Sequence, residues 1–137
     1  MAGMTTQKDI DFRVFARGAA SVATYAQGDV IFHEGEPSDS MYIVLSGSVD
    51  IESHGKFIET IEAGRALGFA SVLDQVPRTT TARARERCEL AVMDRRKFRY
   101  MVDEVPNFAW YVMHELTHRL RMLNAAIEHA PPSGNAA

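Results

Sequence analysis

Short runs of apolar and polar residues alternate along the chain from Ser21 to Asp94. The runs are about four to eight residues long and rich in Val, Ile, Tyr and Phe, which favour strands. Glycines at close intervals end the runs and leave no room for helices between them. This pattern predicts an antiparallel sandwich or roll, built from the runs SVATYA, VIFHEG, MYIVLSG, SVDIES, KFIETIEAG, TTTARA and CELAVMD.

The spacing of apolar residues becomes helical on both sides of this region. We expect a short helix from about Ile10 to Gly18, and a second helix over residues 95–105. Pro106 marks a boundary before a longer helix from Phe108 to about His129. The predicted fold class is therefore α+β: a double-stranded antiparallel β-roll, similar to a jelly roll, with a short N-terminal helix and C-terminal helices.

A chain of 137 residues has the length of one domain. We expect a disordered N-terminus over residues 1–9, a single domain over 10–129, and a disordered tail over 130–137. The 15 basic and 18 acidic side chains give a formal charge of −3, so no overall positive potential attracts DNA or an anionic membrane. Any anion has to be bound locally.

The single cysteine, Cys88, cannot form an intramolecular disulfide and lies in an alternating apolar run. This favours a reducing compartment. No apolar run approaches the ~18 residues of a membrane span, and the N-terminal residues lack the order of a signal peptide. We therefore expect a cytoplasmic protein without a membrane partner.

The segment Ala63–Arg83 carries the most specific candidate chemistry. It combines a glycine-rich turn, a segment at Phe69–Leu73 that is too short for a full helix, and Arg78 directly after a proline. Backbone N–H groups at a helix start, together with a bidentate guanidinium, can bind a small phosphate. The sequence thus predicts a local phosphate site around Gly68 and Arg78.

The long helix contains a literal match to H-E-x-x-H, because His114 to His118 reads HELTH. This spacing can hold zinc, but a catalytic zinc needs a third protein ligand, and downstream of the motif only Glu128 and His129 remain. We interpret the motif as part of a packing helix and predict no metal ligand. No nucleophile is paired with a base elsewhere in the sequence, so we predict no catalytic residue and a protein that is not an enzyme.

The same helix carries a heptad seam, with apolar residues at alternating spacings of four and three. Three roles stay open: packing on the roll's own core, a homodimer through residues 109–127, or a lid over the phosphate site. The seam consists of Ala109, Met113, Leu116, Leu120, Leu123 and Ile127.

Residues 10–127 resemble the cyclic nucleotide-binding domain shared by catabolite-activator-type regulators, cyclic-nucleotide-dependent kinases and gated channels. The resemblance is carried by GDVIFHEGEPSDSMYIVLSGSVDI, AGRALGFASVLDQVPRTTTARA and CELAVMDRRKFRYMV. It implies cAMP or cGMP as ligand, with no cofactor. It also implies that Arg78 pairs with the cyclic phosphate, that Gly68 and Ala70 donate backbone N–H groups, and that Thr79 and Thr80 line the phosphate and base.

One residue departs from the family pattern: Phe69 stands where the family has a glutamate that accepts the ribose 2′-hydroxyl. The aromatic ring would either stack on the sugar or block it. The chain also ends at Ala137 without the winged-helix domain of the catabolite-activator relatives, so we expect no DNA binding by that route. The predicted function is a non-catalytic sensor that acts on an unknown protein partner, and the alternative is a degenerate fold that binds proteins and no nucleotide.

Overall fold

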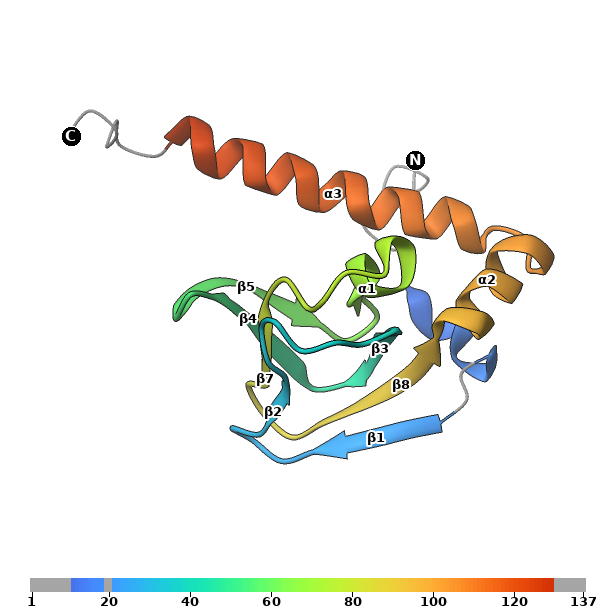
Figure 1. Cartoon of the computed structure of the whole chain (residues 1–137), viewed down its shortest axis with the longest axis horizontal. Coiled ribbons are helices and arrows are strands. Elements are labelled where there is room, and N and C mark those ends of the chain that lie inside the picture. The colour runs from blue at the N-terminus through green and yellow to red at the C-terminus, as the bar shows by residue number, and fades with distance from the viewer. Residues whose placement is uncertain (1–10, 19–20, 130–137) are drawn as a thin grey trace, which may run out of the picture.

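The computed structural model describes residues 11–18 and 21–129. Two four-stranded sheets face each other and form a β-roll, with the helices gathered at one end and along the top (Figure 1). The strand orders are β1-β8-β3-β6 and β2-β7-β4-β5, and all neighbouring strands are antiparallel. The predicted α+β fold class is confirmed.

Each of the seven predicted runs forms a strand, because β-branched and aromatic residues alternate between the inner and outer faces of the sheets. The strand that the sequence pattern missed is β6, a two-residue strand inside the glycine-rich segment, which pairs with β3. The strands are β1 (Ser21–Tyr25), β2 (Val30–Phe32), β3 (Ser40–Ser46), β4 (Ser48–Ser53), β5 (Lys56–Glu62), β6 (Ala66–Leu67), β7 (Thr81–Ala84) and β8 (Cys88–Asp94).

The helices also follow the sequence pattern. The Asp94 side chain accepts a hydrogen bond from the Lys97 N–H at 2.8 Å and so caps the start of α2. The predicted N-terminal helix is a 3-10 helix, and its expected first residue, Ile10, lies outside the described residues. The helices are η2 (Phe12–Gly18), α1 (Phe69–Asp74), α2 (Arg95–Glu104) and α3 (Phe108–His129).

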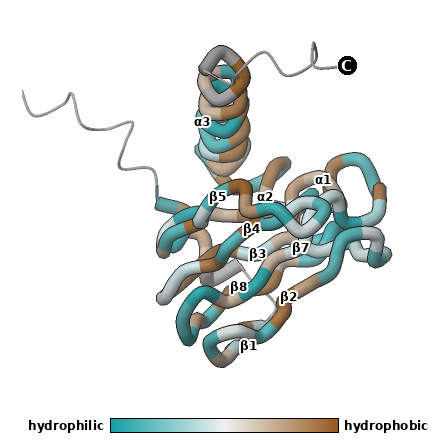
Figure 2. Tube along the Cα trace, turned by 90° about the vertical axis from the view of Figure 1, so that its left-hand side faces the viewer, coloured by the Kyte–Doolittle hydropathy of each residue, from teal (hydrophilic) through white to brown (hydrophobic). Residues whose placement is uncertain are grey.

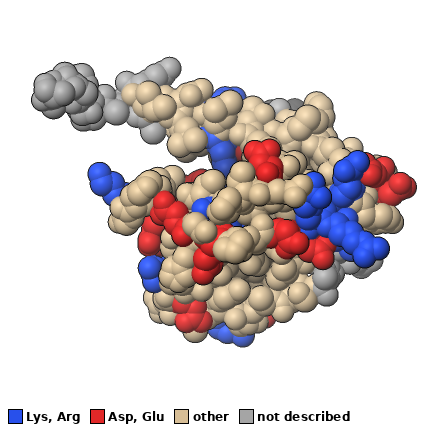
Figure 3. Space-filling view, in the orientation of Figure 1, with Lys and Arg blue, Asp and Glu red and all other residues tan. Residues whose placement is uncertain are grey.

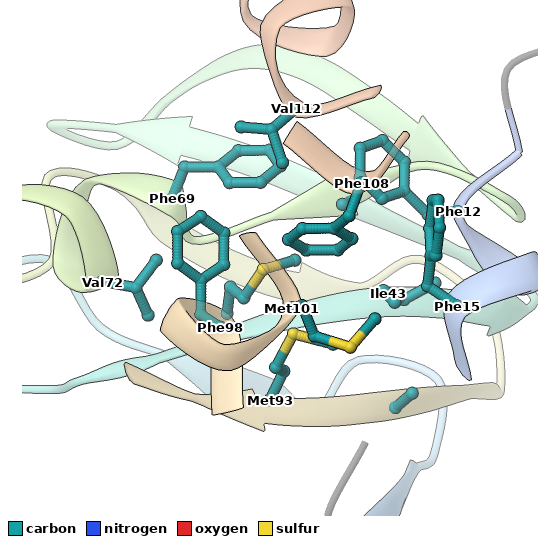
Figure 4. Close-up of a cluster of buried hydrophobic side chains, with 13 residues drawn as sticks. Phe12, Phe15, Ile43, Phe69, Val72, Met93, Phe98, Met101, Phe108 and Val112 are labelled. Carbon is teal, nitrogen blue, oxygen red and sulfur yellow. The ribbon is translucent and has the colours of Figure 1, made fainter. Parts of the chain in front are cut away.

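The hydrophobic core has two parts. One fills the inside of the roll and includes Val49, Ile61 and Leu90. The other lies between the roll and the helices, where η2, α1, α2 and the start of α3 contribute aromatic and sulfur-containing side chains (Figure 4). This second part connects α1 to α3 through shared contacts.

The long helix α3 lies above the roll as a layer of its own (Figures 1 and 2). Its buried apolar side chains, Phe108 and Val112, come from its first half. From Met113 to Ile127 the residues of the heptad seam remain 37–70% exposed. The alternative in which the seam packs on the roll's own core is therefore wrong, while its roles as a dimer interface or as a lid stay open.

The predicted disordered segments, 1–9 and 130–137, lie outside the described residues. Within the described part of the chain, no helix is long and apolar enough to cross a bilayer.

Candidate functional site: a pocket between the roll and α3

A pocket of about 740 Å³ lies between the roll and α3. Figure 3 shows the hollow that separates the outer half of the helix from the roll below it. This volume falls within the range of small-ligand pockets, roughly 300–1,000 Å³. The pocket brings together all six residues that the sequence and the resemblance predicted: Gly68, Phe69, Ala70, Arg78, Thr79 and Thr80.

Arg78 is buried in the wall of this pocket, with 4% of its surface exposed. Its guanidinium carbon lies 4.1 Å from the centroid of the Phe32 ring and 5.5 Å from that of Tyr42. Nη1 donates a hydrogen bond to Ser71 Oγ at 3.3 Å, whereas Nε is buried and has no hydrogen-bond partner among the described residues. The guanidinium therefore keeps unused donor capacity.

Two backbone hydrogen bonds hold Arg78 in place. The Gly35 N–H donates to the Arg78 carbonyl at 2.8 Å, and the Arg78 N–H donates to the Glu36 carbonyl at 2.8 Å.

Burial lowers the pKa of Arg78, and the nearby Tyr42 acts in the opposite direction. Arginine remains charged despite such burial, so the pocket wall holds a fixed positive charge. Within the described residues this charge forms no ion pair. A buried cation of this kind favours binding of an anion.

The backbone beside Arg78 adds N–H groups to the same part of the pocket. Gly68 has φ +90° and precedes α1, whose first N–H groups have no partner within a helix of six residues. A Cβ atom on Gly68 would lie 2.8 Å from Arg78 Nη1, so the glycine backbone and the guanidinium are in close contact. Ala70 is the second residue of α1 and faces the same pocket.

Phe69, the residue that departs from the family pattern, packs in the hydrophobic core. Its ring lies 6.1 Å from the Phe12 ring and 6.5 Å from the Phe98 ring, measured between centroids, and 4% of the residue is exposed. Figure 4 shows it in the same cluster as Val112 of α3. The residue borders the pocket, but its ring is directed into the core and leaves the pocket open.

A charged network that the sequence did not predict holds α3 over the pocket. Glu115 Oε2 lies 2.8 Å from Arg65 Nη2 and 3.1 Å from Arg119 Nη2. Arg119 also donates to the Ala66 carbonyl, and its Nε lies 3.7 Å from Glu59 Oε2 on β5. Burial lowers the pKa of Arg119, while Glu115 and Glu59 counteract this effect. Glu115 and Arg119 are four residues apart on α3, but the sequence does not connect this pair with Glu59 and Arg65, which lie far upstream in the chain.

The HELTH motif has a structural use in this network. Its glutamate, Glu115, is 6% exposed and is paired with two arginines, so it is not free to act as a base. The His114 ring packs against Trp110 with centroids 4.9 Å apart. Among the described residues, no group of three or more His, Cys, Asp or Glu side chains could hold a metal ion. The arrangement gives no support to the hypothesis of a zinc enzyme.

A family model described as the cyclic nucleotide-binding domain matches residues 22–105, which include both Gly68 and Arg78. The chain belongs to this family. The match spans β1 to α2 and ends before α3.

Relatives of known function carry the same domain within longer proteins. A CRP-like cAMP-activated global transcriptional regulator of Mycobacterium tuberculosis is 29% identical over 105 residues, 73% of this chain and 47% of that protein. Human Rap guanine nucleotide exchange factor 3 is 31% identical over 80 residues, 57% of this chain and 9% of that protein. The chain thus spans less than half the length of these relatives.

Solved structures agree on the fold. The catabolite activator protein of Thermus thermophilus superposes with a TM-score of 0.74 at 26% identity, over 85% of this chain and 56% of that one. The N-terminal domain of a transcriptional regulator from Streptomyces coelicolor superposes with a TM-score of 0.62 at 25% identity, over 88% of this chain and 86% of that one. Both likenesses cover the roll together with its helices.

Proposed function

We propose that the domain is a non-catalytic sensor of cAMP or cGMP. The observation that carries this proposal is the buried guanidinium of Arg78, which has an unpaired Nε among the described residues and lies against Gly68 at the start of α1. A cyclic phosphate is small, singly charged and rich in acceptor oxygens, so it complements one guanidinium and a few N–H groups. Thr79 and Thr80, which also line the pocket, lie next to the proposed phosphate position.

Binding of the phosphate would be linked to α3 through Phe69. This residue directly follows Gly68, and its ring packs in the cluster that contains Phe108 and Val112 of α3. A ligand that draws the start of α1 toward Arg78 also displaces this ring. The ligand then binds more tightly to the conformation in which α3 fits the displaced ring. The population of that conformation therefore rises when the ligand is present.

The output of the sensor would be a protein contact made by the heptad seam of α3. The seam is exposed from Met113 to Ile127, and such an apolar stripe favours self-association or docking of another protein. We propose a homodimer through residues 109–127 as the first partner to test. With a formal charge of −3, neither DNA nor a membrane is proposed as a partner, and the single cysteine favours a cytoplasmic location.

The test is isothermal titration calorimetry with cAMP and cGMP. Wild type should bind at least one of them with one site per chain. Arg78→Ala should weaken binding by about a hundredfold or more, because a bidentate charged contact is lost. Arg99→Ala removes an exposed arginine on α2 and serves as the matched control with unchanged affinity. Binding that Arg78→Ala leaves intact would reject the site.

The second candidate function is a domain that has kept the fold and lost the ligand. The observation that favours it is Phe69, because the ring is committed to the core and the family's carboxylate acceptor is missing there. A hydrogen bond to a charged acceptor contributes about 1.5–3 kcal/mol, so its loss weakens binding about ten- to a hundredfold. Absence of any thermal shift with saturating cAMP or cGMP would favour this function over the sensor.

A further inference from the structure

The part of the pocket between β5 and α3 is apolar on both of its sides. The strand contributes Phe57 and Ile58, and the helix contributes Leu116, Met122 and Leu123. These five side chains, which we call the apolar mouth, are 37–63% exposed. Exposed apolar side chains that gather around one pocket mark a surface that a ligand can cover.

The apolar mouth lies away from Arg78. Glu52 of β4 pairs with Thr81 of β7 on one side and with Phe57 of β5 on the other. Neighbouring strands lie about 4.8 Å apart, so Phe57 is roughly 10 Å from Thr81, three residues after Arg78. The pocket therefore joins a cationic end to an apolar part about two strands away.

Arg78 is the charged lining residue that lacks an ion-pair partner among the residues described. The other two charged lining residues are Glu59 and Arg119, and Glu59 Oε2 lies 3.7 Å from Arg119 Nε. Arg119 is also paired with Glu115. The charges of β5 and α3 compensate each other, so the pocket keeps the positive charge of Arg78.

Within the described part of the chain, no lining residue offers a free carboxylate. Phe69 stands where the family has a glutamate, and the Glu59 carboxylate is paired with Arg119. A carboxylate is a strong acceptor for the hydroxyl groups of a ligand, and it repels a ligand that is itself an anion. The pocket is thus poorly equipped to hold a sugar and well equipped to admit an acidic head group.

We propose that the pocket binds amphiphilic monoanions, with medium-chain fatty acids as the ligand class. This inference goes beyond the proposed function and does not depend on it. The carboxylate of the ligand pairs with the planar guanidinium of Arg78. Both groups carry a single charge, whereas a phosphate monoester carries about −1.5 to −2 and leaves part of its charge uncompensated in a buried position.

The hydrocarbon chain of the ligand extends from Arg78 to the apolar mouth and covers its side chains. This removes apolar surface of both ligand and protein from water, which favours binding in proportion to the area covered. The pocket volume of about 740 Å³ lies within the range of small-ligand pockets. Each CH₂ group that enters the mouth strengthens binding, so the affinity depends on the chain length.

The test is isothermal titration calorimetry of the full chain with butanoate, hexanoate, octanoate and decanoate, each below its micelle concentration. Wild type should bind one carboxylate per chain, and the affinity should rise about two- to fourfold for each added CH₂ group, where fourfold corresponds to complete burial. Octan-1-ol has the chain length of octanoate and no charge. It should bind wild type at least about tenfold more weakly, because it forms no ion pair with Arg78.

Two kinds of variant locate the ligand, and thermal melting verifies that each is folded. Arg78→Ala should weaken octanoate binding about tenfold or more and leave octan-1-ol binding within about twofold. Ile58→Ser should reduce the gain in affinity per CH₂ group. Leu73→Ser is the matched control, because it changes a similarly exposed apolar residue that does not line the pocket, and it should keep the wild-type gain.

Equal affinities of wild type for octanoate and octan-1-ol would overturn the inference without any variant, since the charged head group would then contribute nothing. An affinity that is independent of chain length, or a gain per CH₂ group that Ile58→Ser leaves intact, would overturn it as well. Titration of cAMP and cGMP on the same samples separates the two proposals. Nucleotide binding without carboxylate binding rejects this inference alone, carboxylate binding without nucleotide binding rejects the proposed function alone, and binding of neither rejects both.

Discussion

The close contact between Gly68 and Arg78 gives a sharp prediction for Gly68→Ala. A Cβ atom there would lie 2.8 Å from Arg78 Nη1 and 3.2 Å from both Met41 Cα and the Ser40 carbonyl oxygen. The backbone contacts cannot yield without moving β3. The arginine tip can yield, but it then leaves the position in which it faces the pocket.

Gly28 provides a matched control for the backbone. It has the same φ of +90° as Gly68, and a Cβ atom at Gly28 would meet nothing within 4 Å. Each substitution to alanine costs about 1–2 kcal/mol of unfolding free energy, because a side chain is forced into the left-handed region. Gly68→Ala should lose a further ~1–3 kcal/mol from overpacking. The difference in unfolding free energy between the two variants therefore gives the cost of the close contacts at Gly68 without the cost of the left-handed backbone.

The assay combines urea denaturation with calorimetric titration of cAMP and cGMP. Gly28→Ala should lose stability and keep its nucleotide affinity to within about twofold. Gly68→Ala should lose more stability and bind at least about tenfold more weakly, since the displaced guanidinium forfeits a charged hydrogen bond. Equal affinities of the two variants would refute the argument that Gly68 and Arg78 form one anion site.

Three further predictions concern other parts of the molecule. Glu115→Ala leaves the half-buried Arg65 without its ion pair and Arg119 with Glu59 as its remaining one, and should cost about 1–3 kcal/mol of unfolding free energy in urea denaturation, whereas Asp103→Ala, which breaks an exposed pair, should cost about 0–1 kcal/mol. Leu120→Asp, in the exposed seam, should convert a dimer to a monomer in sedimentation velocity, and an unchanged sedimentation coefficient would exclude the seam as the interface. Burial raises the pKa of the Cys88 thiol, so a thiol reagent should react slowly with the native protein and rapidly in concentrated urea.

The fold was predictable from the sequence because its signals are local. Alternating apolar runs and glycine turns define seven of the strands, and Pro106 marks the boundary between α2 and α3. The strand β6 was missed because two residues carry no periodicity, and its existence depends on pairing with β3. Local sequence patterns specify the longer strands and helices, whereas a two-residue strand such as β6 depends on the tertiary structure that places it beside β3.

The residues of the proposed anion site could be identified in part from the sequence. Gly68 and Arg78 are near each other along the chain, so the sequence alone is enough to connect the turn with the guanidinium. The orientation of Phe69 was not predictable, because the family resemblance assigns that position to the ribose, while packing against Phe12 and Phe98 directs the ring into the core. Substituting a glutamate there would bury a carboxylate among aromatic rings.

The residues that line the far side of the pocket could not be found from the sequence. Glu59 and Arg119 are distant along the chain and are brought together by the position of α3 over β5. In the sequence, the charge of Glu59 is one of several in the run KFIETIE and carries no distinguishing mark. Which face of β5 the residue occupies depends on the pairing register with β4, which the alternation of the run alone leaves ambiguous.

The central claim is that the phosphate of a cyclic nucleotide binds the Arg78 guanidinium and the backbone at the start of α1. The most direct measurement is a ¹H–¹⁵N NMR titration that follows the Arg78 Nε–H signal and the amide signals of Gly68 and Ala70. With cAMP or cGMP, these signals should move downfield and saturate together, because each group gains an acceptor. If saturating nucleotide leaves all three signals unmoved, or moves others instead, the phosphate does not bind there.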